Sequence, residues 1–321
     1  MRPILYGILA SLFFSSTFIL NQAMKWEGGN WMYTACLRFL FMIPLLLVIV
    51  AIRGKLKPLL LEMKKRPRSW LGWSFVGFGM MYVPVCFAAD YEPGWLIAGT
   101  WQITIVAGAL MSPLFYKTVP APGGSMRVRE TIHWKGISMS AVILLGALMM
   151  QLSQAESLSG RDLLLGAAPV ALAAFAYPLG NRKMMEVCEG RLDAYQRTLG
   201  MSLATLPLWL ILFVAAFIEG GPPSAGQTGQ SLLVALCSGV IATVLFFAAT
   251  DMAKGSAPKL AAVEATQSGE VVFATAGELL LLPVGLPPLM SWIGMLIVVA
   301  GMTLYSVYSG RVATADNTLR A

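Results

Sequence analysis

The chain has 321 residues, of which 57% are apolar and only 12% are charged, and its mean hydropathy is +0.70. This composition argues against a soluble domain, because a soluble surface needs far more polar side chains. The net charge of +7 does not indicate a nucleic-acid partner, since the basic residues lie in the connections between apolar stretches.

Ten apolar stretches approach the length of about 20 residues that a helix needs to cross a bilayer. They cover residues 3–22, 31–52, 70–90, 94–115, 136–154, 161–181, 198–218, 231–250, 260–282 and 289–308. Their continuous apolar runs argue against a β-barrel, whose strands alternate apolar and polar residues. We therefore expect an all-α polytopic membrane protein with ten transmembrane helices in the lipid bilayer.

The distribution of lysine and arginine predicts the orientation of these helices. Almost all of the 23 basic residues fall on the side of the amino terminus; only Lys25 and Arg161 fall on the other side, and Arg38 lies inside a helix. Because cytoplasmic loops carry the excess of basic residues, we predict a multi-pass protein of the cytoplasmic membrane with both termini in the cytoplasm. The connection 53–68 also carries leucines and is expected to lie on anionic lipid headgroups, although an ordinary inner loop is the simpler interpretation.

Two polar residues near the outer ends of the first two helices are candidates for a binding site. Asn21 ends the first helix, and Arg38 lies about 10 Å deep in the second. Arg38 is expected to bind an anionic group of a substrate, to pair with Glu278 or Asp90, or to extend outward to water.

Further candidates lie in the fourth and sixth helices. Trp101 is the deepest of several aromatic residues that could hold an organic cation by cation–π attraction, although an interfacial aromatic belt explains most of them. Gln102 beside it is as well suited to bonding a neighbour as to lining a pathway. Tyr177, followed by Pro178, marks a possible kink at the end of the sixth helix.

The ninth stretch carries the most informative polar residues. At about 100° per residue, Glu264, Glu270 and Glu278 fall within an arc of about 120°, with Gln267 on the same side. An ionisable side chain at membrane depth is costly, so this stripe should face protein or a water-filled cavity. We expect Glu270, near the midplane, to exchange a proton or a cationic substrate between the two faces. A structural carboxyl is the alternative, and it is at least as strong for Glu264 and Glu278.

The two halves of the chain, 1–155 and 156–321, contain matching short sequences at an offset of about 160, which indicates an internal repeat. The matched pairs at helix ends are Asn21 with Asn181, Arg38 with Arg197, and Asp90 with Asp251. Because five helices per repeat is an odd number, the second copy must enter the membrane from the opposite face. We therefore predict two inverted five-helix repeats in one transmembrane domain, with the substrate site between them near the midplane.

This architecture and the ninth stretch resemble the drug/metabolite transporter superfamily, and within it the EamA-type carriers and the ten-helix multidrug resistance efflux transporters. The resemblance is most specific in residues 262–272 with Gly277-Glu278, and in Trp292-Ile293-Gly294 and Ala300-Gly301-Met302. It departs from the four-helix small multidrug carriers, which exchange protons through a glutamate in the first helix. The first helix of this chain has no acidic residue, so that mechanism does not transfer by position.

We expect a secondary active transporter that exports small organic molecules, drug-like cations or metabolites, with proton coupling through the intramembrane glutamates as the preferred mechanism. An amino-acid or other metabolite carrier that uses Arg38 is the alternative. An enzyme or a passive channel is less favoured, because the single histidine, His133, lies in a connection and no phosphate-binding Gly-x-x-x-x-Gly-Lys motif occurs. The cysteines lack metal-ligand spacing, so no metal or cofactor is expected, and the chain should act as a monomer or a homodimer.

Overall fold

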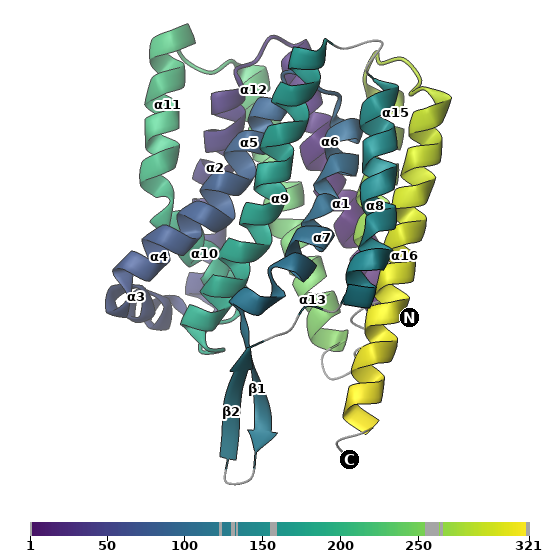
Figure 1. Ribbon diagram of the computed structural model, residues 1–321. Helices are drawn as coiled ribbons and strands as arrows, with labels where there is room; N and C mark the ends of the chain where they lie inside the picture. Colours follow the sequence, from purple (N-terminus) through teal and green to yellow (C-terminus); the bar gives the residue numbers. More distant parts are fainter. Residues whose placement is uncertain are drawn as a thin grey trace.

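The computed structural model describes residues 2–121, 124–129, 132, 134–154, 159–253, 263 and 266–318. Helices that run side by side form most of the molecule (Figure 1). The first half contains α1 (Arg2–Trp26), α2 (Trp31–Ile52), α3 (Leu56–Lys65), α4 (Pro67–Ser74), α5 (Met80–Ala88), α6 (Gly94–Trp101), α7 (Ile103–Leu110) and α8 (Trp134–Ser153). The second half contains α9 (Gly160–Cys188), α10 (Ala194–Ala204), α11 (Leu206–Gly220), α12 (Ala225–Val234), α13 (Thr243–Ala253), α15 (Gly269–Leu281) and α16 (Leu289–Thr318).

Four short segments of other helical geometry complete these elements. Two π-helical segments, η1 (Phe75–Gly79) and η3 (Ala235–Ala242), join α4 to α5 and α12 to α13. Two 3₁₀ segments, η2 (Ser112–Leu114) and η4 (Thr266–Ser268), follow α7 and precede α15. Local π geometry is often found near functional sites, and both π segments lie inside longer apolar helices.

Five helical segments are long and apolar enough to cross a membrane, and a sixth is added when α10 and α11, bent by 49°, are taken as one span. The five are Arg2–Trp26, Trp31–Ile52, Pro67–Ala88, Gly160–Cys188 and Ala225–Phe246. The described chain is thus predominantly helical, with five or six candidate membrane spans. The full count of ten transmembrane helices and the inverted repeat stay predictions.

Two of the predicted stretches are broken in the structure. The stretch 94–115 divides into α6 and α7 at Gln102, and the stretch 198–218 divides into α10 and α11 at Thr205. The second break precedes Pro207, which has no backbone N–H to donate and is therefore well placed in the first turn of α11.

One connection of this predominantly helical chain contains strands, which the sequence analysis did not predict. The strands β1 (Tyr116–Ala121) and β2 (Gly124–Arg129) form an antiparallel hairpin in which Tyr116 pairs with Arg129. The hairpin extends below the helices in Figure 1. Thr118, Val119 and Val128 are β-branched and favour extended backbone, and the pairing satisfies backbone groups of a connection that lies outside the helical bundle.

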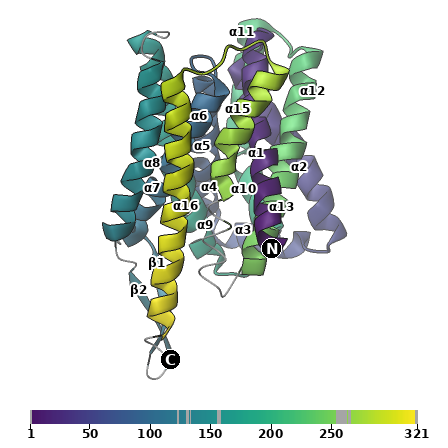
Figure 2. The same ribbon diagram turned by 90° about the vertical axis from the view of Figure 1, so that its right-hand side faces the viewer.

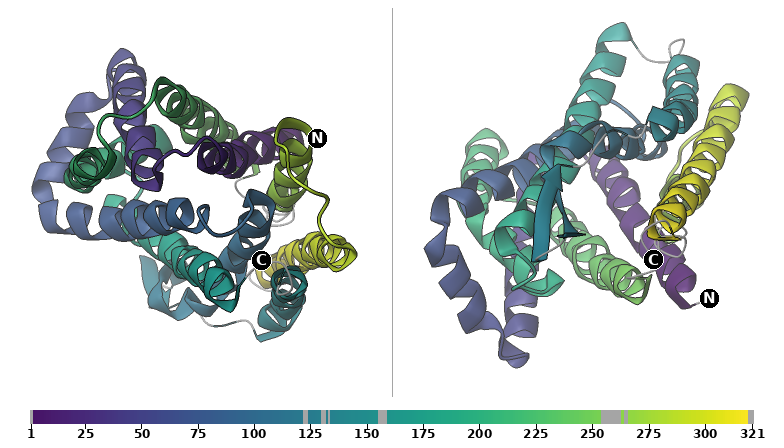
Figure 3. Two further views of the ribbon diagram at one scale, coloured as in Figure 1. Left: turned by 90° about the horizontal axis from the view of Figure 1, so that it is seen from above. Right: turned by 60° about the horizontal axis from the view of Figure 1, so that its bottom comes forward.

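Both chain ends lie toward the same end of the bundle, which is also the end that carries α3 and the hairpin (Figure 1). In the view from above in Figure 3, most helices are seen close to their axes, so their axes run in roughly the same direction. This arrangement gathers the termini and the basic connection 53–68 on one side.

Helices α8 and α16 lie side by side in Figures 1 and 2 and make extensive contact. Their contact passes through glycines: a Cβ on Gly146 would lie 2.7 Å from the carbonyl oxygen of Gly294, and a Cβ on Gly294 would lie 2.7 Å from that of Gly146. Gly301 approaches Ile143 in the same way. The glycine pattern of the last helix therefore permits close packing of two helices.

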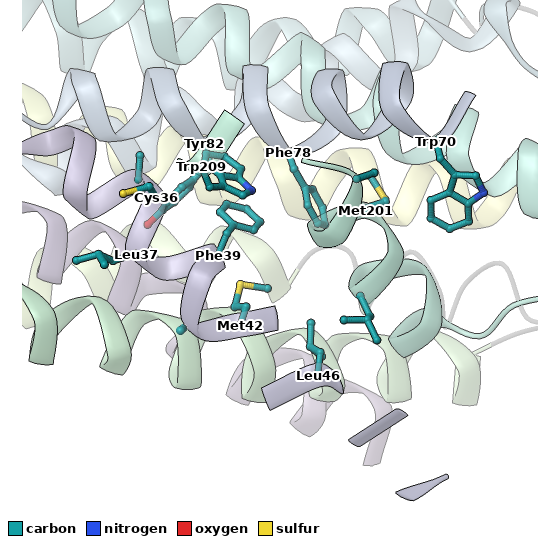
Figure 4. Packing of buried hydrophobic residues seen from close by; sticks show 14 of the residues in the cluster. Cys36, Leu37, Phe39, Met42, Leu46, Trp70, Phe78, Tyr82, Met201 and Trp209 are labelled. Carbon is teal, nitrogen blue, oxygen red and sulfur yellow. The ribbon is translucent and has the colours of Figure 1, made fainter. Parts of the chain in front are cut away.

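An aromatic cluster connects α2 with α5 and α11 (Figure 4). The ring of Phe39 stacks on that of Trp209 with a centroid separation of 4.2 Å, and its edge meets Tyr82 at 5.6 Å. All three side chains are at most 1% exposed. Because Phe39 is fixed on both sides, its neighbour Arg38 is held at a defined position inside the protein.

Candidate functional site

Glu270 lies in the first turn of α15 and is only 6% exposed. It forms no ion pair and no hydrogen bond with any other described residue. The helix begins against α1, where a Cβ on Gly269 would lie 2.8 Å from the Ser11 hydroxyl. The unpaired N–H groups at the start of a helix favour a negative charge, so α15 partly compensates a carboxylate that has no cationic partner here.

Tyr177 connects Glu270 with two other predicted residues. Its ring lies 5.5 Å from that of Trp101, between centroids, at an angle of 54°. It is also within electrostatic range of both Glu270 and Arg38. Trp101 of α6 and Tyr177 of α9 are therefore in contact, whereas Glu270 of α15 and Arg38 of α2 act on Tyr177 only through electrostatics.

Arg38 is buried in α2, with 8% of its surface exposed. It forms no ion pair with any described residue, so the predicted pairing with Glu278 or Asp90 is wrong, and its burial also contradicts an outward extension to water. Its guanidinium donates instead to the hydroxyls of Thr17 at 3.4 Å and Ser238 at 3.0 Å. Neutral hydroxyls orient the cation but do not neutralise it.

The Arg38 side chain borders further polar groups of α1 and α5. Its guanidinium carbon lies 4.2 Å from the ring centroid of Tyr82, a cation–π distance. Cys86 lies one turn beyond Tyr82, and its Sγ accepts a hydrogen bond from Nδ2 of Asn21 at 3.7 Å. Sequence analysis singled out Asn21 but missed Thr17, Ser238 and Tyr82, because single hydroxyls inside apolar helices are common and carry no signal of their own.

Glu278 is fully buried, and its carboxylate faces the N–H groups of Gly94 and Trp95 without forming a hydrogen bond to a described residue. These groups open α6, so the carboxylate sits at a helix N-terminus, where negative charge is stabilised. A Cβ on Gly94 would collide with this carboxylate and would lie 2.6 Å from the carbonyl oxygen of Phe18. This position favours the structural alternative for Glu278.

Two further predicted residues, Gln102 and Gln267, make no hydrogen bond to Tyr177 or Glu270. Gln102 is 3% exposed and donates to the carbonyl oxygen of Ala98 in its own helix at 3.2 Å. Gln267 lies in η4, and its buried Nε2 makes no hydrogen bond to a described residue. Glu264 lies outside the described residues, so its placement is not tested.

Glu92 is a buried carboxylate that sequence analysis missed. It lies in the connection between α5 and α6, is fully buried, and accepts from Gln151 of α8 at 3.1 Å. Gln151 also donates to Thr100 at 2.9 Å. Burial raises the pKa of Glu92 to about 7. Its position beside Pro93 at the end of a predicted helix indicates an exposed loop, and only the packing of α8 and α9 over that loop buries it.

Within the described residues, no group of three His, Cys, Asp or Glu side chains is placed to hold a metal ion. Glu270, Arg197 and Arg38 all lie within electrostatic range of Tyr177, and the buried Glu270 and Arg38 form no ion pair with a described residue. Such a pair of sites can bind charged groups of a small molecule or exchange a proton.

Comparison with known proteins identifies the family. Residues 1–311 match EmrE, described as "Putative multidrug resistance efflux transporter". The Bacillus subtilis (strain 168) protein "Uncharacterized protein YjlA" is 57% identical over 309 residues, which are 96% of this chain and 95% of that protein. A Shouchella clausii protein, "Uncharacterized 42.1 kDa protein in intracellular alkaline protease 3'region", is 53% identical over 270 residues, or 84% of this chain and 70% of that protein.

A solved crystal structure is similar in fold, with a TM-score of 0.63 and 16% sequence identity over 97% of this chain and 98% of that one. At that identity the similarity concerns the fold alone. The match to the family covers nearly the whole chain, and the apolar helices agree with a membrane transporter. The chain therefore belongs to the EmrE family of multidrug resistance efflux transporters.

Proposed function

We propose that this protein is a secondary active transporter that exports small organic molecules, drug-like cations or metabolites, across the cytoplasmic membrane. The observation that carries the proposal is the buried Glu270 carboxylate, which has no cationic partner among the described residues of an efflux-family chain. A group of this kind is costly inside a membrane and is retained where it binds a cation or a proton.

The proposed architecture is ten transmembrane helices in two inverted repeats, residues 1–155 and 156–321. The two π-helical segments support it, because Phe75 and Ala235, at which they begin, are separated by the same offset of about 160 as the matching sequences. Two equivalent irregularities at equivalent positions are expected of a duplicated unit.

The helix contacts provide a second line of support. In a repeat that relates α1 to α9, η1 to η3 and α5 to α13, each contact in one half should have a counterpart with the halves exchanged. The described structure contains such pairs: α5 packs on α9 and α13 packs on α1, while η1 packs on α9 and η3 packs on α1. Each proposed repeat thus packs a helix against the first helix of the other, which suits rocking of one repeat against the other.

In the proposed mechanism the site between the repeats opens alternately to each face. Glu270 holds a proton when the site is open to the outside and releases it to the cytoplasm as it binds a cationic substrate, with Glu264 and Gln267 as neighbours on the same segment. Trp101 and Tyr177 add aromatic faces that attract an organic cation. Both termini are cytoplasmic, and the arrangement functions in a monomer or in a homodimer.

The second candidate is a carrier for amino acids or other metabolites. The observation that favours it is Arg38, a buried guanidinium held by two hydroxyls and by no carboxylate of the described residues. Such a group suits an anionic substrate.

Transport in reconstituted vesicles tests the leading proposal. With tetraphenylphosphonium as the probe, an imposed proton gradient should drive accumulation by the wild-type protein but not by Glu270→Gln. Glu219→Gln is the matched control, because Glu219 is an exposed carboxylate that bonds only Asn30 among the described residues. If Glu270→Gln retains full proton-driven transport, the coupling assignment is wrong.

A further inference from the structure

The short helix α3 lies between the ends of two candidate membrane spans. The span Trp31–Ile52 ends three residues before α3 begins, and the span Pro67–Ala88 begins directly after Arg66. Because a span ends near the surface of the bilayer, a short helix between two such ends is held at that surface. In Figure 1, α3 lies at the same end of the bundle as both termini.

The two faces of α3 differ in what they contact. Leu59 is fully buried against α10, where a Cβ on Gly200 would lie 2.8 Å from its Cδ1, and Glu62 on the same side is 4% exposed. The opposite face spans an arc of about 140° and exposes two leucines and three lysines. They are Leu60 and Leu61, 49% and 52% exposed, with Lys57, Lys64 and Lys65.

A pocket of about 330 Å³ opens between this exposed face and the segment that precedes α10. Its volume falls within the range of about 300–1,000 Å³ that is typical of small-molecule sites. The lining residues come from both halves of the chain. We call Lys57, Leu61, Glu62, Lys65, Arg191 and Leu192 the α3 pocket.

The charges in the α3 pocket are unequally compensated. Arg191 donates to both carboxylate oxygens of Glu62 and also bonds Glu189, so its charge is neutralised. Lys65 lies 3.8 Å from the Glu62 carboxylate, with 69% of its side chain exposed. Lys57 forms no ion pair with a described residue. The excess positive charge of the pocket therefore lies on Lys57 and Lys65.

We propose that the α3 pocket binds the phosphate group of an anionic phospholipid. Lys57 and Lys65 bind the phosphate, since an ammonium group is a compact charge that suits a phosphate oxygen. The acyl chains extend past Leu61, which lines the same pocket and is half exposed. A basic pocket beside an apolar surface at the end of a helix bundle is complementary in charge to a lipid headgroup.

This site is narrower than the general contact of residues 53–68 with headgroups that the sequence predicts. It requires the two lysines of the pocket, and it excludes Lys64 and Arg68, which are as exposed to the surface but do not line the pocket. It also contacts both halves of the chain, since α3 belongs to the first half and Arg191 to the second. A ligand that binds only this folded arrangement raises the stability of the protein by mass action.

Thermal stability of the full-length protein in a non-ionic detergent tests the site. The probes are dihexanoyl phosphatidylglycerol, which is anionic, dihexanoyl phosphatidylcholine, which has no net charge, and glycerol 3-phosphate, which has a phosphate but no acyl chain. We expect phosphatidylglycerol to raise the melting temperature in a saturable way. The other two should have no effect at the same concentrations.

Two double variants with the same loss of charge locate the binding. Lys57→Gln with Lys65→Gln should raise the half-saturating concentration of phosphatidylglycerol by about tenfold to thirtyfold, because each basic residue near an anionic lipid contributes about fivefold. Both side chains are exposed, so the fold should be retained. Lys64→Gln with Arg68→Gln is the matched control, and it should change that concentration by less than about threefold.

Three results would overturn the site. If phosphatidylcholine stabilises the protein as strongly as phosphatidylglycerol does, the charge of the headgroup is not recognised. If glycerol 3-phosphate acts at the same concentration, the pocket binds a free phosphate ester and not a lipid. If the control variant weakens binding as much as the pocket variant does, the connection is an ordinary basic inner loop without a defined lipid site.

Discussion

Glu62 and Glu270 are both buried carboxylates, 4% and 6% exposed, but their surroundings differ. Glu62 lies in the amphipathic α3 and receives two hydrogen bonds from Arg191, at 2.9 Å and 3.2 Å. Arg191 holds the pKa of Glu62 below its usual range. Glu270, inside the bundle, forms no ion pair with a lysine or arginine of the described residues.

The ion pairs near Glu62 join the two halves of the chain. Arg191 follows α9, and Glu62 precedes α4. Beside them, Asp193 forms ion pairs with Lys55 at 2.7 Å and Arg53 at 3.4 Å. The carboxylates of Glu62 and Asp193 are therefore neutralised by ion pairs that join the two halves at the end of the bundle. Glu270, where we propose that ligand and proton bind, forms no ion pair with a described residue.

The largest expected effect is on the number of protons that the protein releases when a cation binds, which should depend on Glu270 and not on Glu62. When tetraphenylphosphonium binds to the wild-type protein in weakly buffered detergent solution, we expect release of about one proton per bound cation, because binding and protonation compete at Glu270. Glu270→Gln should bind without releasing a proton, and Glu62→Gln should behave as the wild type does. Proton release that survives in Glu270→Gln and disappears in Glu62→Gln would reverse the comparison. The measurement is a pH electrode or indicator titration.

Glu92 sharpens the comparison, because it is buried with only an amide for a partner. Its folded pKa of about 7 is raised by burial, so the folded state holds a proton that the unfolded chain releases near pH 4.3. Stability should therefore fall as pH rises from about 4.3 to 7, by up to about 3 kcal/mol. Glu92→Gln should melt at a higher temperature than the wild type at pH 8 and lose this advantage at pH 5. Equal differences at both pH values would contradict the burial effect.

Glu62 should show the opposite dependence on pH. Its folded pKa is lowered by Arg191, so its contribution to stability is present above the unfolded value of about 4.3 and is lost as pH falls through the folded value. At pH 7 we expect Glu62→Gln to destabilise by about 1–2 kcal/mol, since Arg191 is partly exposed and water screens the pair. In a double-mutant cycle with Arg191→Gln, the two losses should sum to more than that of the double variant. Strict additivity would mean that the pair contributes nothing.

The smallest expected effect is that of Lys55. Its ion pair with Asp193 is exposed on the lysine side, so Lys55→Met should lower stability by about 0.5 kcal/mol, and less in 1 M salt. Asp193→Asn should cost a similar amount, because asparagine can keep the N-cap bond to Gln196. A decrease in the free energy of unfolding above about 2 kcal/mol for Lys55→Met would show that this ion pair is stronger than a surface pair.

Some helical segments could be predicted closely from the sequence. The stretch 31–52 coincides with α2, and 136–154 nearly coincides with α8, because the length of an apolar run is a local property. The hairpin after α7 could not be predicted in this way, since its strands are short and pair only with each other. The break at Gln102 was also missed, because nothing in that local sequence resembles a helix end.

The candidate site was predictable in part. Glu270, Arg38, Trp101 and Tyr177 stand out as polar or aromatic residues in apolar stretches, and Trp101 contacts Tyr177 in the structure. The partners of Arg38 did not stand out. Ser238 lies 200 residues away in the chain, and neither it nor Thr17 differs from an ordinary hydroxyl in a helix.

The amino-acid sequence by itself determined that this chain is a helical membrane protein, which residues carry charge into its apolar segments, and on which side the basic connections gather. These properties follow from composition and from short-range spacing, because the length and polarity of each segment decide whether it fits the bilayer. Only the tertiary structure decided that Glu62 is paired with Arg191 and that Arg38 meets hydroxyls instead of a carboxylate. Whether a buried charge is neutralised depends on which distant helix packs against it, and no local pattern encodes that contact.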